Sequence, residues 1–372
     1  MTWHVWRNMD WVLASSMLAA ASLGVIAIAS VSGSGLSSIA LHQAFWVVLG
    51  SCAFVVFAHL DYHILPAWRH WIYGLMVVLL LAVFVLGHDK LGAERSISVG
   101  PLQLEPVEPV KLLLVITLAI VLESRLGTLR RLRDLIVPGL YAAVPVLLVM
   151  AEPDLGSSMV LLSILLMMIF AAGYSGSRLL LLVILGLALV IGLIIAHLRW
   201  NVPIPLHSYQ LNRLTAFLNP QANALNYGLQ TIESEVAIGS GRIHGTGLFS
   251  TGVSHQLAYV PERASDFIFA AISNQFGLYG ALVTVGLESL ITWRALRCMV
   301  RARDGYGGLL AAGVAAMIGC QAFLNIGVAL GLLPVTGVPL PFISQGGSAT
   351  LADFAAVGLL ESVYIRSHPI PY

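Results

Sequence analysis

Long apolar stretches separated by short polar segments organise this chain. A membrane-spanning helix needs about 20 consecutive, mostly apolar residues, and the pattern contains about ten stretches of that kind. They lie near residues 11–32, 42–60, 70–88, 109–124, 135–152, 155–174, 178–198, 267–293, 306–332 and 349–365. We therefore expect an all-α polytopic membrane protein in which residues 1–372 form one domain. The long polar segment 199–265 is expected to be a large extracytoplasmic loop between spans seven and eight.

The composition agrees with this pattern. Of the 372 residues, 58% are hydrophobic and 10% are charged, and the mean hydropathy is +0.88. Soluble domains do not have such a composition, and the net charge of +1 gives no indication of nucleic-acid binding. The first apolar stretch is too long for a signal-peptide core and is counted as a span. Because Cys52, Cys298 and Cys320 have neither paired nor metal-type spacing, we expect buried thiols rather than disulfides or ligands.

The arginines predict the orientation in the membrane. If both termini are cytoplasmic, the inner segments contain twelve Lys and Arg residues and the outer segments contain seven. Two inner segments are rich in arginine, namely "RLGTLRRLRD" (125–134) and "RALRCMVRARD" (294–304). Basic residues concentrate in the cytoplasmic loops of membrane proteins. We therefore expect residues 199–265 on the outer side.

The outer side contains the unusual polar sequence. Segment 332–348 is rich in proline and glycine, which interrupt helices and are tolerated at membrane depth only where protein or water satisfies the backbone. Ionisable residues lie at span ends or in the long loop: Glu108, Lys111, Asp154, Arg213, Arg242, Glu262, Arg263 and Asp266. Such groups mark a functional site in a membrane protein. Arginines beside carboxylates suit an anionic, phosphorylated substrate next to a base.

Several of these residues also have a purely structural interpretation. Glu108 and Lys111 have the i, i+3 spacing of an ordinary ion pair on a helix. Asp154 is placed to cap the span that follows it. Asp266 is placed as a first-turn acid that favours the helix dipole, with Ser265 as the cap. Together, however, they favour one site on the outer side.

The order of five motifs resembles the SEDS family (shape, elongation, division and sporulation), the RodA/FtsW/SpoVE-type peptidoglycan glycosyltransferases. The motifs are "GAERSISVGPLQLEPVEPVKL" (92–112), "EPDLGSS" (152–158), "AIGSGRIHGTGL" (237–248), "QLAYVPERASDFIFAAISNQFGLYG" (256–280) and "NIGVALGLLPVTGVPLPFISQGGSA" (325–349). The last two are very specific. Because the chain has no long cytoplasmic tail, it looks closer to RodA, the elongation branch, than to FtsW, the division branch.

The resemblance implies a function and a site. Enzymes of this family polymerise lipid II by joining the sugar of one lipid-linked disaccharide to another, with inversion, and release undecaprenyl diphosphate. Asp266 is then the expected catalytic base. The expected substrate-binding residues are Lys111, Glu108, Arg213, Arg242, Arg263, Glu262, Asp154 and Ser348. Glycoside hydrolysis normally uses two carboxylates, but a diphosphate whose charge is neutralised leaves without protonation, so one base and several cations suffice.

The resemblance also implies the setting of the reaction. We expect no tightly bound cofactor, and a divalent cation, Mg²⁺ or Mn²⁺, is a candidate to assist at the diphosphate; the metal ligands are unknown. The expected partners are lipid II, the membrane and a class B penicillin-binding protein, and not nucleic acid. Small residues within 306–322 would allow a partner helix to approach closely in lipid. The expected location is the bacterial cytoplasmic (inner) membrane, with both termini cytoplasmic.

A few positions differ from the usual family pattern. Ser96 stands where the family usually has Trp, and Glu105 stands where it usually has Gln. Asn274 and Gln275 replace a common acidic pair, and Gln345 replaces a usual Tyr. These differences leave the expected base unchanged. They are expected to alter substrate contacts in the first outer loop.

A flippase or transporter of a lipid-linked cell-wall precursor is the alternative function. Broken helices and intramembrane glycines would serve it as well. Such a protein needs polar residues along a path through the bilayer, whereas the sequence collects its charges at one face and leaves the span interiors nearly free of them. This difference favours a glycosyltransferase. A catalytically inactive scaffold for a penicillin-binding partner is a third function, and Asp266 argues against it.

Overall fold

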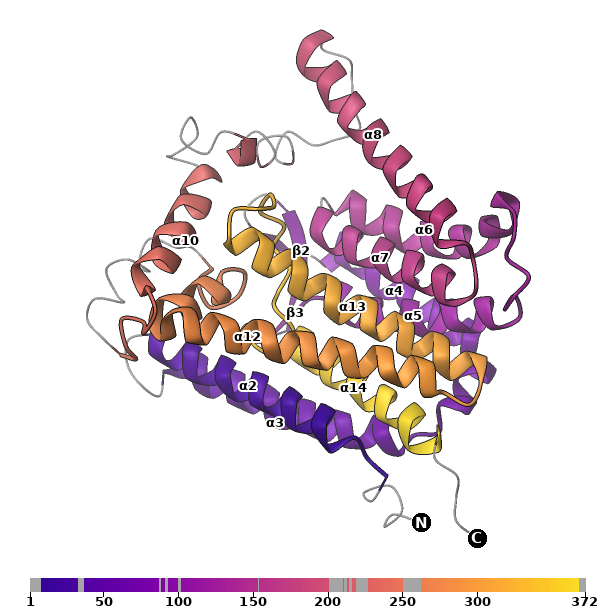
Figure 1. The fold of residues 1–372 in the computed structure, drawn as a ribbon, viewed down its shortest axis with the longest axis horizontal. Coiled ribbons are helices and arrows are strands. Elements are labelled where there is room, and N and C mark those ends of the chain that lie inside the picture. The colour runs from indigo at the N-terminus through magenta and orange to yellow at the C-terminus, as the bar shows by residue number, and fades with distance from the viewer. Residues whose placement is uncertain are drawn as a thin grey trace.

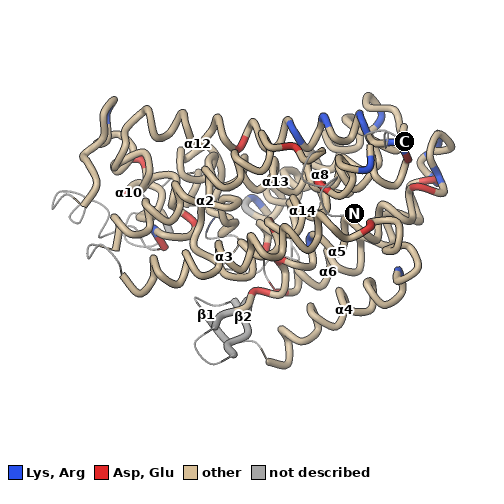
Figure 2. Tube along the Cα trace, turned by 90° about the horizontal axis from the view of Figure 1, so that it is seen from below, with Lys and Arg blue, Asp and Glu red and all other residues tan. Residues whose placement is uncertain are grey.

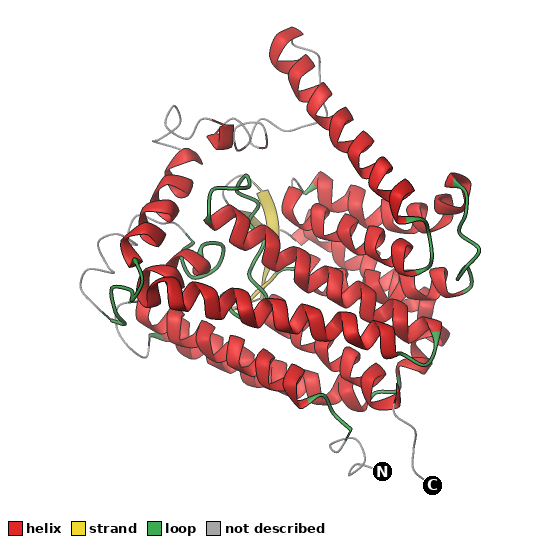
Figure 3. Cartoon of the chain, in the orientation of Figure 1, coloured by secondary structure: helices red, strands yellow, loops and turns green. Residues whose placement is uncertain are grey.

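The structure is a computed structural model in which helices account for most of the described chain (Figures 1 and 3). It describes residues 8–32, 37–86, 88–90, 93–99, 102–152, 154–200, 210, 213, 216–218, 227–249 and 262–367. Much of the predicted outer loop therefore lies outside the described residues.

Ten long helices correspond to the ten predicted spans. They are α2 (Trp11–Val31), α3 (Ser38–His59), α4 (Arg69–Leu86), α5 (Val107–Glu123), α6 (Ile136–Ala151), α7 (Leu155–Ala171), α8 (Gly176–Trp200), α12 (Ile268–Arg301), α13 (Gly305–Ala329) and α14 (Gly347–Ser367). Among the described residues, eight helical stretches are long and apolar enough to cross a membrane. The other two, α5 and α7, have 17 residues each, which is at the short end of the range for spans. The prediction of an all-α polytopic membrane protein is confirmed.

Smaller elements lie between these helices. Two short 3₁₀ helices, η1 (Tyr62–Trp68) and η2 (Leu132–Leu135), precede α4 and α6. Three strands that the sequence did not predict, β1 (His88–Lys90), β2 (Ala93–Val99) and β3 (Leu102–Leu104), form a small antiparallel sheet in the order β1-β2-β3. The predicted outer loop also contains a helix, α10 (Tyr227–Gly241), so it is more ordered than expected.

The centre of the bundle is formed by α13 and α14, and α8 lies at its edge. In their most apolar stretches, 72% of α13 and 83% of α14 is buried, compared with 6% of α8, which projects from the bundle in Figure 1. Small residues permit the close packing of α13, because a Cβ on Gly313 would meet Val115 of α5 and Met168 of α7 within 3 Å. Such contacts are typical of helix packing in membranes.

The two ends of the bundle differ in charge. Most Lys and Arg positions gather toward the end at which α2 begins and α14 ends (Figure 2). This arginine-rich end includes the segment 124–134 between α5 and α6 and the turn between α12 and α13. At the opposite end lie α10 and the start of α12 (Figure 1). The predicted site residues belong to that opposite end.

Candidate active site

Asp266 lies in a turn, residues 262–267, directly before α12. The N-cap of α12 is Phe267, without a side-chain cap hydrogen bond, and the first turn of the helix contains no acidic residue. The interpretation of Asp266 as a first-turn acid capped by Ser265 is therefore wrong. Helix capping does not explain why an aspartate lies at the mouth of this apolar span.

The backbone of the Asp266 turn is held by α13. Asn325 is buried in α13, and its amide nitrogen donates to the backbone oxygens of Asp266 and of Val338, each at 2.9 Å. Val338 belongs to the connector, residues 330–346, which joins α13 to α14. One buried side chain therefore fixes the turn and the connector together.

The connector also binds the turn directly. The backbone N–H of Gln345 donates to the carbonyl of Ala264 at 2.8 Å, and the hydroxyl of Ser344 donates to the carbonyl of Ser265 at 2.6 Å. Gln43 of α3 in turn donates to the carbonyl of Ser344 at 3.1 Å. Because Gln345 contributes its backbone, this contact does not depend on the replacement of the usual Tyr.

Glu108 and Lys111 form a buried ion pair at the start of α5. Lys111 Nζ lies 2.7 Å from Glu108 Oε1, and both side chains are at most 2% exposed. In the amide orientation that satisfies both of its ends, Gln321 of α13 accepts from Lys111 Nζ at 2.7 Å. The i, i+3 pairing is thus confirmed, and it fastens α5 to α13. Direct contact of either residue with a substrate stays a prediction.

Asp154 caps α7, as its position in the sequence predicts. Its carboxylate accepts from the N–H of Ser157 at 3.1 Å and is buried. Gly156 follows in the same turn, where a Cβ would lie 2.5 Å from the side chain of Val338 and 2.7 Å from the oxygen of Thr336. The start of α7 therefore packs directly against the connector.

Ser348 links the start of α14 to the start of α5. Its hydroxyl accepts from the backbone N–H of Glu105 at 3.0 Å. The neighbouring Gly347 faces Trp46 of α3 so closely that a Cβ would lie 2.3 Å from the indole ring. The glycine allows α14 to begin directly against Trp46 of α3.

Four helix N-termini thus meet around the connector, those of α5, α7, α12 and α14. A helix N-terminus carries a partial positive charge of about +0.5 and N–H groups without partners inside the helix. Such ends favour anionic ligands. At α7 this end is already occupied by the carboxylate of Asp154, and the other ends lie among the carboxylates around the Asp266 turn.

The pKa of Glu105 reflects the charges that surround the Asp266 turn. Desolvation by the surrounding protein raises the pKa of Glu105, the charges of Glu108, Asp266 and Asp154 raise it further, and Lys111 lowers it. The side chain of Glu105 keeps contact with solvent at the rim of the cluster, so the desolvation is partial although protein atoms are dense around it. The predicted carboxylates are thus close enough to influence one another.

The predicted arginines lie at different places around this end. Arg213 donates from Nη1 to the backbone oxygen of Val335 in the connector at 2.9 Å. Arg263 is partly buried in the Asp266 turn, whereas Arg242 and Glu262 are exposed. The structure therefore brings Arg213 and Arg263 to the connector and the turn. Contact of these four residues with a substrate stays a prediction.

Comparison with known proteins agrees with this architecture. The family model described as cell cycle protein, for the FtsW, RodA and SpoVE proteins, matches residues 3–368. The chain belongs to this family. Stage V sporulation protein E of Bacillus subtilis (strain 168) is 35% identical to this SEDS protein over 331 residues, which cover 87% of the chain and 86% of that relative. Peptidoglycan glycosyltransferase MrdB of Escherichia coli (strain K12) is 32% identical over 326 residues, with coverages of 86% and 83%.

A solved structure resembles this SEDS chain over nearly its whole length. It is described as "Structural coordination of polymerization and crosslinking by a peptidoglycan synthase complex". The TM-score is 0.80 at 29% identity, and the match covers 97% of this chain and 98% of that one. The family resemblance that the five motifs predict is confirmed.

In this SEDS protein, α12 is broken near the candidate site. At Gly277, φ is 65° and ψ is −155°. The freed backbone groups pair with the segment after α10 in the bonds Leu278 N–H to Arg242 O (2.9 Å), Thr246 N–H to Asn274 O (2.9 Å) and Gly247 N–H to Gln275 O (3.1 Å). The two backbones are so close that a Cβ on Gly277 would lie 2.4 Å from the nitrogen of Gly245. This is how an interrupted membrane helix is satisfied by protein.

The same contact explains one departure from the family pattern. The amide nitrogen of Asn274 donates to the carbonyl of Ala237 at 3.0 Å and to the hydroxyl of Ser240 at 2.6 Å, and its oxygen accepts from the hydroxyl of Thr246 at 3.1 Å. A carboxylate has no hydrogen-bond donor. Asn274 therefore donates hydrogen bonds to α10 that an acidic residue could not donate.

The sequence analysis missed the residues that position the turn. Asn325, Gln43 and Gln321 are almost fully buried, and each lies inside an otherwise apolar span. A neutral polar residue at membrane depth needs a hydrogen-bond partner. That rule could have singled out these amides, although it could not have named their partners.

A protein-held metal does not fit the residues of this site. Among the residues that the structure describes, no group of three or more His, Cys, Asp or Glu side chains is arranged to hold a metal ion. Glu108 is paired with Lys111, and Asp154 caps α7. A divalent cation that arrives with the substrate phosphates stays a prediction, and no step below depends on it.

Proposed function

We propose that this chain polymerises lipid II into glycan strands during cell-wall elongation, as a peptidoglycan glycosyltransferase that releases undecaprenyl diphosphate. The observation that carries the proposal is the position of Asp266. It does not cap α12, and α13 and the connector hold its turn where four helix N-termini meet. Relatives named peptidoglycan glycosyltransferase support the reaction class.

In the proposed step, Asp266 is the general base. Its carboxylate accepts the proton of the acceptor hydroxyl while that oxygen attacks the anomeric carbon of the donor sugar. The bond from this carbon to the diphosphate oxygen breaks, and the diphosphate leaves with the bonding electron pair. A single displacement of this kind inverts the anomeric configuration. The proton then passes from Asp266 to solvent.

The leaving diphosphate is proposed to meet positive charge rather than an acid. Arg213 and Arg263 are candidates for this role, because a guanidinium forms paired hydrogen bonds with phosphate oxygens. The helix N-termini add partial positive charge. The raised pKa of Glu105 acts in the same direction, since its protonated form reduces the negative charge beside Asp266.

The depth of the charges does not distinguish a polymerase from the alternative function, a flippase. The prediction that the span interiors are nearly free of ionisable groups is wrong, because Glu288 of α12 and Asp353 and Glu361 of α14 are at most 2% exposed. The preference for a polymerase therefore depends on the position of Asp266 and on the names of the relatives.

A class B penicillin-binding protein is the proposed partner. The similar solved structure is described as a complex that coordinates polymerization with crosslinking, and crosslinking is transpeptidase chemistry. Two of the small residues in 306–322 face the interior of the chain. A Cβ would meet Tyr62 and Val363 at Gly307, and Val115 at Gly313, so these glycines serve packing within the chain.

The proposed orientation has both termini in the cytoplasm of a bacterial cell, inside its cytoplasmic membrane. Val236 in α10 and Leu132 in η2, which directly precedes α6, are exposed. Single cysteines at these positions, in a variant without the three native cysteines, should react oppositely with a membrane-impermeant thiol reagent on intact cells. Labelling only Val236→Cys is expected, and labelling Leu132→Cys would contradict the orientation.

A polymerisation assay tests the function. Purified protein is incubated with lipid II, with and without a class B penicillin-binding protein, and the glycan products are separated by length. Formation of strands is expected, and it should increase with the partner. Movement of lipid II across vesicles without any product would favour the flippase.

A further inference from the structure

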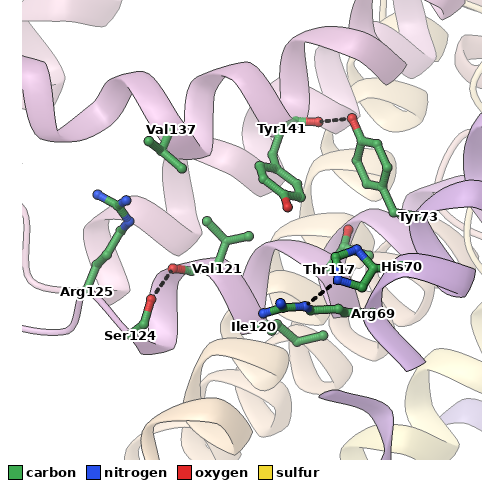
Figure 4. A pocket seen from close by; sticks show the side chains of 10 residues that line it. All are labelled: Arg69, His70, Tyr73, Thr117, Ile120, Val121, Ser124, Arg125, Val137 and Tyr141. Carbon is green, nitrogen blue, oxygen red and sulfur yellow. Dashed lines mark hydrogen bonds between the residues drawn. The ribbon is translucent and has the colours of Figure 1, made fainter. Parts of the chain in front are cut away.

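A second polar recess lies at the arginine-rich end, away from Asp266. It is a cavity of about 290 Å³ between α4, the end of α5 and α6 (Figure 4). Its polar lining includes Arg69, His70, Tyr73, Thr117, Arg125 and Tyr141. Ligand sites usually have volumes of about 300–1,000 Å³, so this cavity suits a small headgroup. None of these residues belongs to the candidate active site.

Two guanidinium groups make the cavity positive. In the part of the chain that the structure describes, neither Arg69 nor Arg125 forms an ion pair with a carboxylate. Glu123, the acid nearest to Arg125 in the sequence, does not line the cavity. The C-terminus of α5 contributes a partial charge of about −0.5, which is smaller than two full positive charges. The cavity therefore favours an anion.

Neighbouring groups orient the donors. Arg69 donates from Nε to Nε2 of His70 at 3.0 Å, which leaves the terminal nitrogens of the guanidinium for other partners. Tyr73 donates to the backbone oxygen of Tyr141 at 3.2 Å and ties α4 to α6. The hydroxyl of Tyr141 points into the space between the lining residues (Figure 4). It adds an uncharged donor to the two cations.

The surroundings indicate a lipid rather than a free ion. Trp68 and Trp71 flank the basic start of α4 and are 58% and 76% exposed, as is typical of aromatic residues at a membrane interface. Val137 and Tyr141 line the cavity on α6, and the i+3 neighbour Val144 on the same helix face is exposed. An acyl chain can follow this face from the cavity toward the membrane centre.

We propose that this cavity binds the phosphate group of an anionic phospholipid, with Arg69 and Arg125 as the cations and Tyr141 as a further donor. Basic pockets between membrane helices on the arginine-rich side are suited to anionic headgroups. The lipid would join α4, α5 and α6 at the end opposite to Asp266. The proposal does not depend on the reaction catalysed at the other end.

The test uses the purified full-length protein in detergent, short-chain phosphatidylglycerol as the probe and the melting temperature as the readout. A ligand that binds the folded state raises the melting temperature in a concentration-dependent way. The variant Arg69→Gln/Arg125→Gln should need at least roughly tenfold more lipid for the same rise, because hydrogen bonds to charged groups are lost. Arg130→Gln/Arg133→Gln removes the same charge from the neighbouring loop and should respond as the wild type.

A second variant keeps both arginines and fills the cavity. Val137→Trp should weaken the response as well, which separates a cavity from general attraction between a basic surface and anionic lipid. Equal weakening in the Arg130→Gln/Arg133→Gln control, or an unchanged response of the cavity variants, would overturn the proposal.

Two further probes identify the source of the phosphate. A saturable rise with inorganic phosphate alone, lost in the cavity variants, would assign the site to a free ion and overturn the lipid. An equal response to phosphatidylcholine would show that net negative charge is not required. The expected result is a rise with phosphatidylglycerol only.

Discussion

The arginine-rich end and the Asp266 end use their carboxylates differently. At the arginine-rich end, the Asp10 carboxylate binds Arg294, with Nε to Oδ2 at 2.6 Å, and accepts from the N–H of Leu13. At the other end, Asn325 positions Asp266 through its backbone oxygen. The placement of the Asp266 turn therefore does not depend on its carboxylate alone.

Two predicted residues at the Asp266 end also make structural contacts through their carboxylates. Glu108 is committed to Lys111, and Asp154 is committed to the N-terminus of α7. These residues resemble Asp10 in their use, although they lie beside the candidate base. Contact of Glu108 and Asp154 with a substrate stays a prediction, and the variants below test whether their structural contacts are their whole role.

The largest effect is expected for Asp266→Asn. The substitution keeps the size of the side chain and removes the proton acceptor, so lipid II polymerisation should fall by roughly 10²–10⁴-fold, as is typical for a lost general base. The melting temperature should remain close to that of the wild type. A folded Asp266→Asn protein that still polymerises lipid II would assign the role of base to another residue.

Asp154→Asn is the matched control for this variant. Asparagine caps helices about as well as aspartate, so both stability and polymerisation should be largely retained. A loss of activity as large as that of Asp266→Asn, in a protein of unchanged stability, would place Asp154 in the reaction and weaken the distinction.

The next largest effect is expected for Asp10→Asn at the arginine-rich end. The variant keeps the cap of α2 but leaves Arg294 without its buried partner, which should lower the free energy of unfolding by about 3 kcal/mol. Asp61→Asn is the control, because the pairs of Asp61 with His63 and Arg366 are half exposed and are expected to contribute about 1 kcal/mol or less. Equal losses in denaturant titrations of the two variants would contradict this ranking.

A smaller but clear effect is expected for Gly277→Ala at the α12 break. Its positive φ is strained for alanine, and the new Cβ would meet Gly245, so the free energy of unfolding should fall by about 2 kcal/mol. Gly239→Ala in α10 has no atom within 4 Å of its Cβ and should stabilise the helix by roughly 0.5–1 kcal/mol. The melting temperatures of the two variants measure this difference. Equal melting temperatures would show that the break in α12 does not require glycine at position 277.

The sequence could predict the spans better than the site. The apolar stretches predict the ten helices because a membrane imposes length and composition on each span separately. Local pattern also predicts the Asp154 cap and the Glu108–Lys111 pair, since both connect residues three positions apart. The small sheet was missed because its strands are short and lie in a polar segment.

The assembly of the site could not be predicted, because it depends on contacts between distant segments. Asn325 reaches back to Asp266, and Gly245 packs on Gly277. No local pattern in one sequence shows such pairs. Glu288 lies inside the predicted span 267–293, so the sequence already places this carboxyl at membrane depth, and only its packing partners depend on how α12 packs.

The smallest effect concerns the rim of the site and depends on pH. Surrounding protein and the neighbouring carboxylates raise the pKa of Glu105 from 4.5 to about 7. For an acid whose pKa is higher in the folded state, the stabilising contribution is present below the unfolded value and is lost as pH rises through the folded value. The wild type should therefore lose stability between about pH 4.5 and pH 7 relative to a variant that cannot ionise there.

Glu105→Gln, which restores the residue usual in the family, tests this rim effect. Its stability should match that of the wild type near pH 4.5 and exceed it at pH 7 and above. The gain should be about 1 kcal/mol or less, because Glu105 keeps contact with solvent. Melting temperatures of both proteins across this pH range provide the measurement. If the melting temperatures of the two proteins change with pH in parallel, the carboxylates of Asp266, Asp154 and Glu108 do not raise the pKa of Glu105. The carboxylates would then lie farther apart than the backbone contacts indicate.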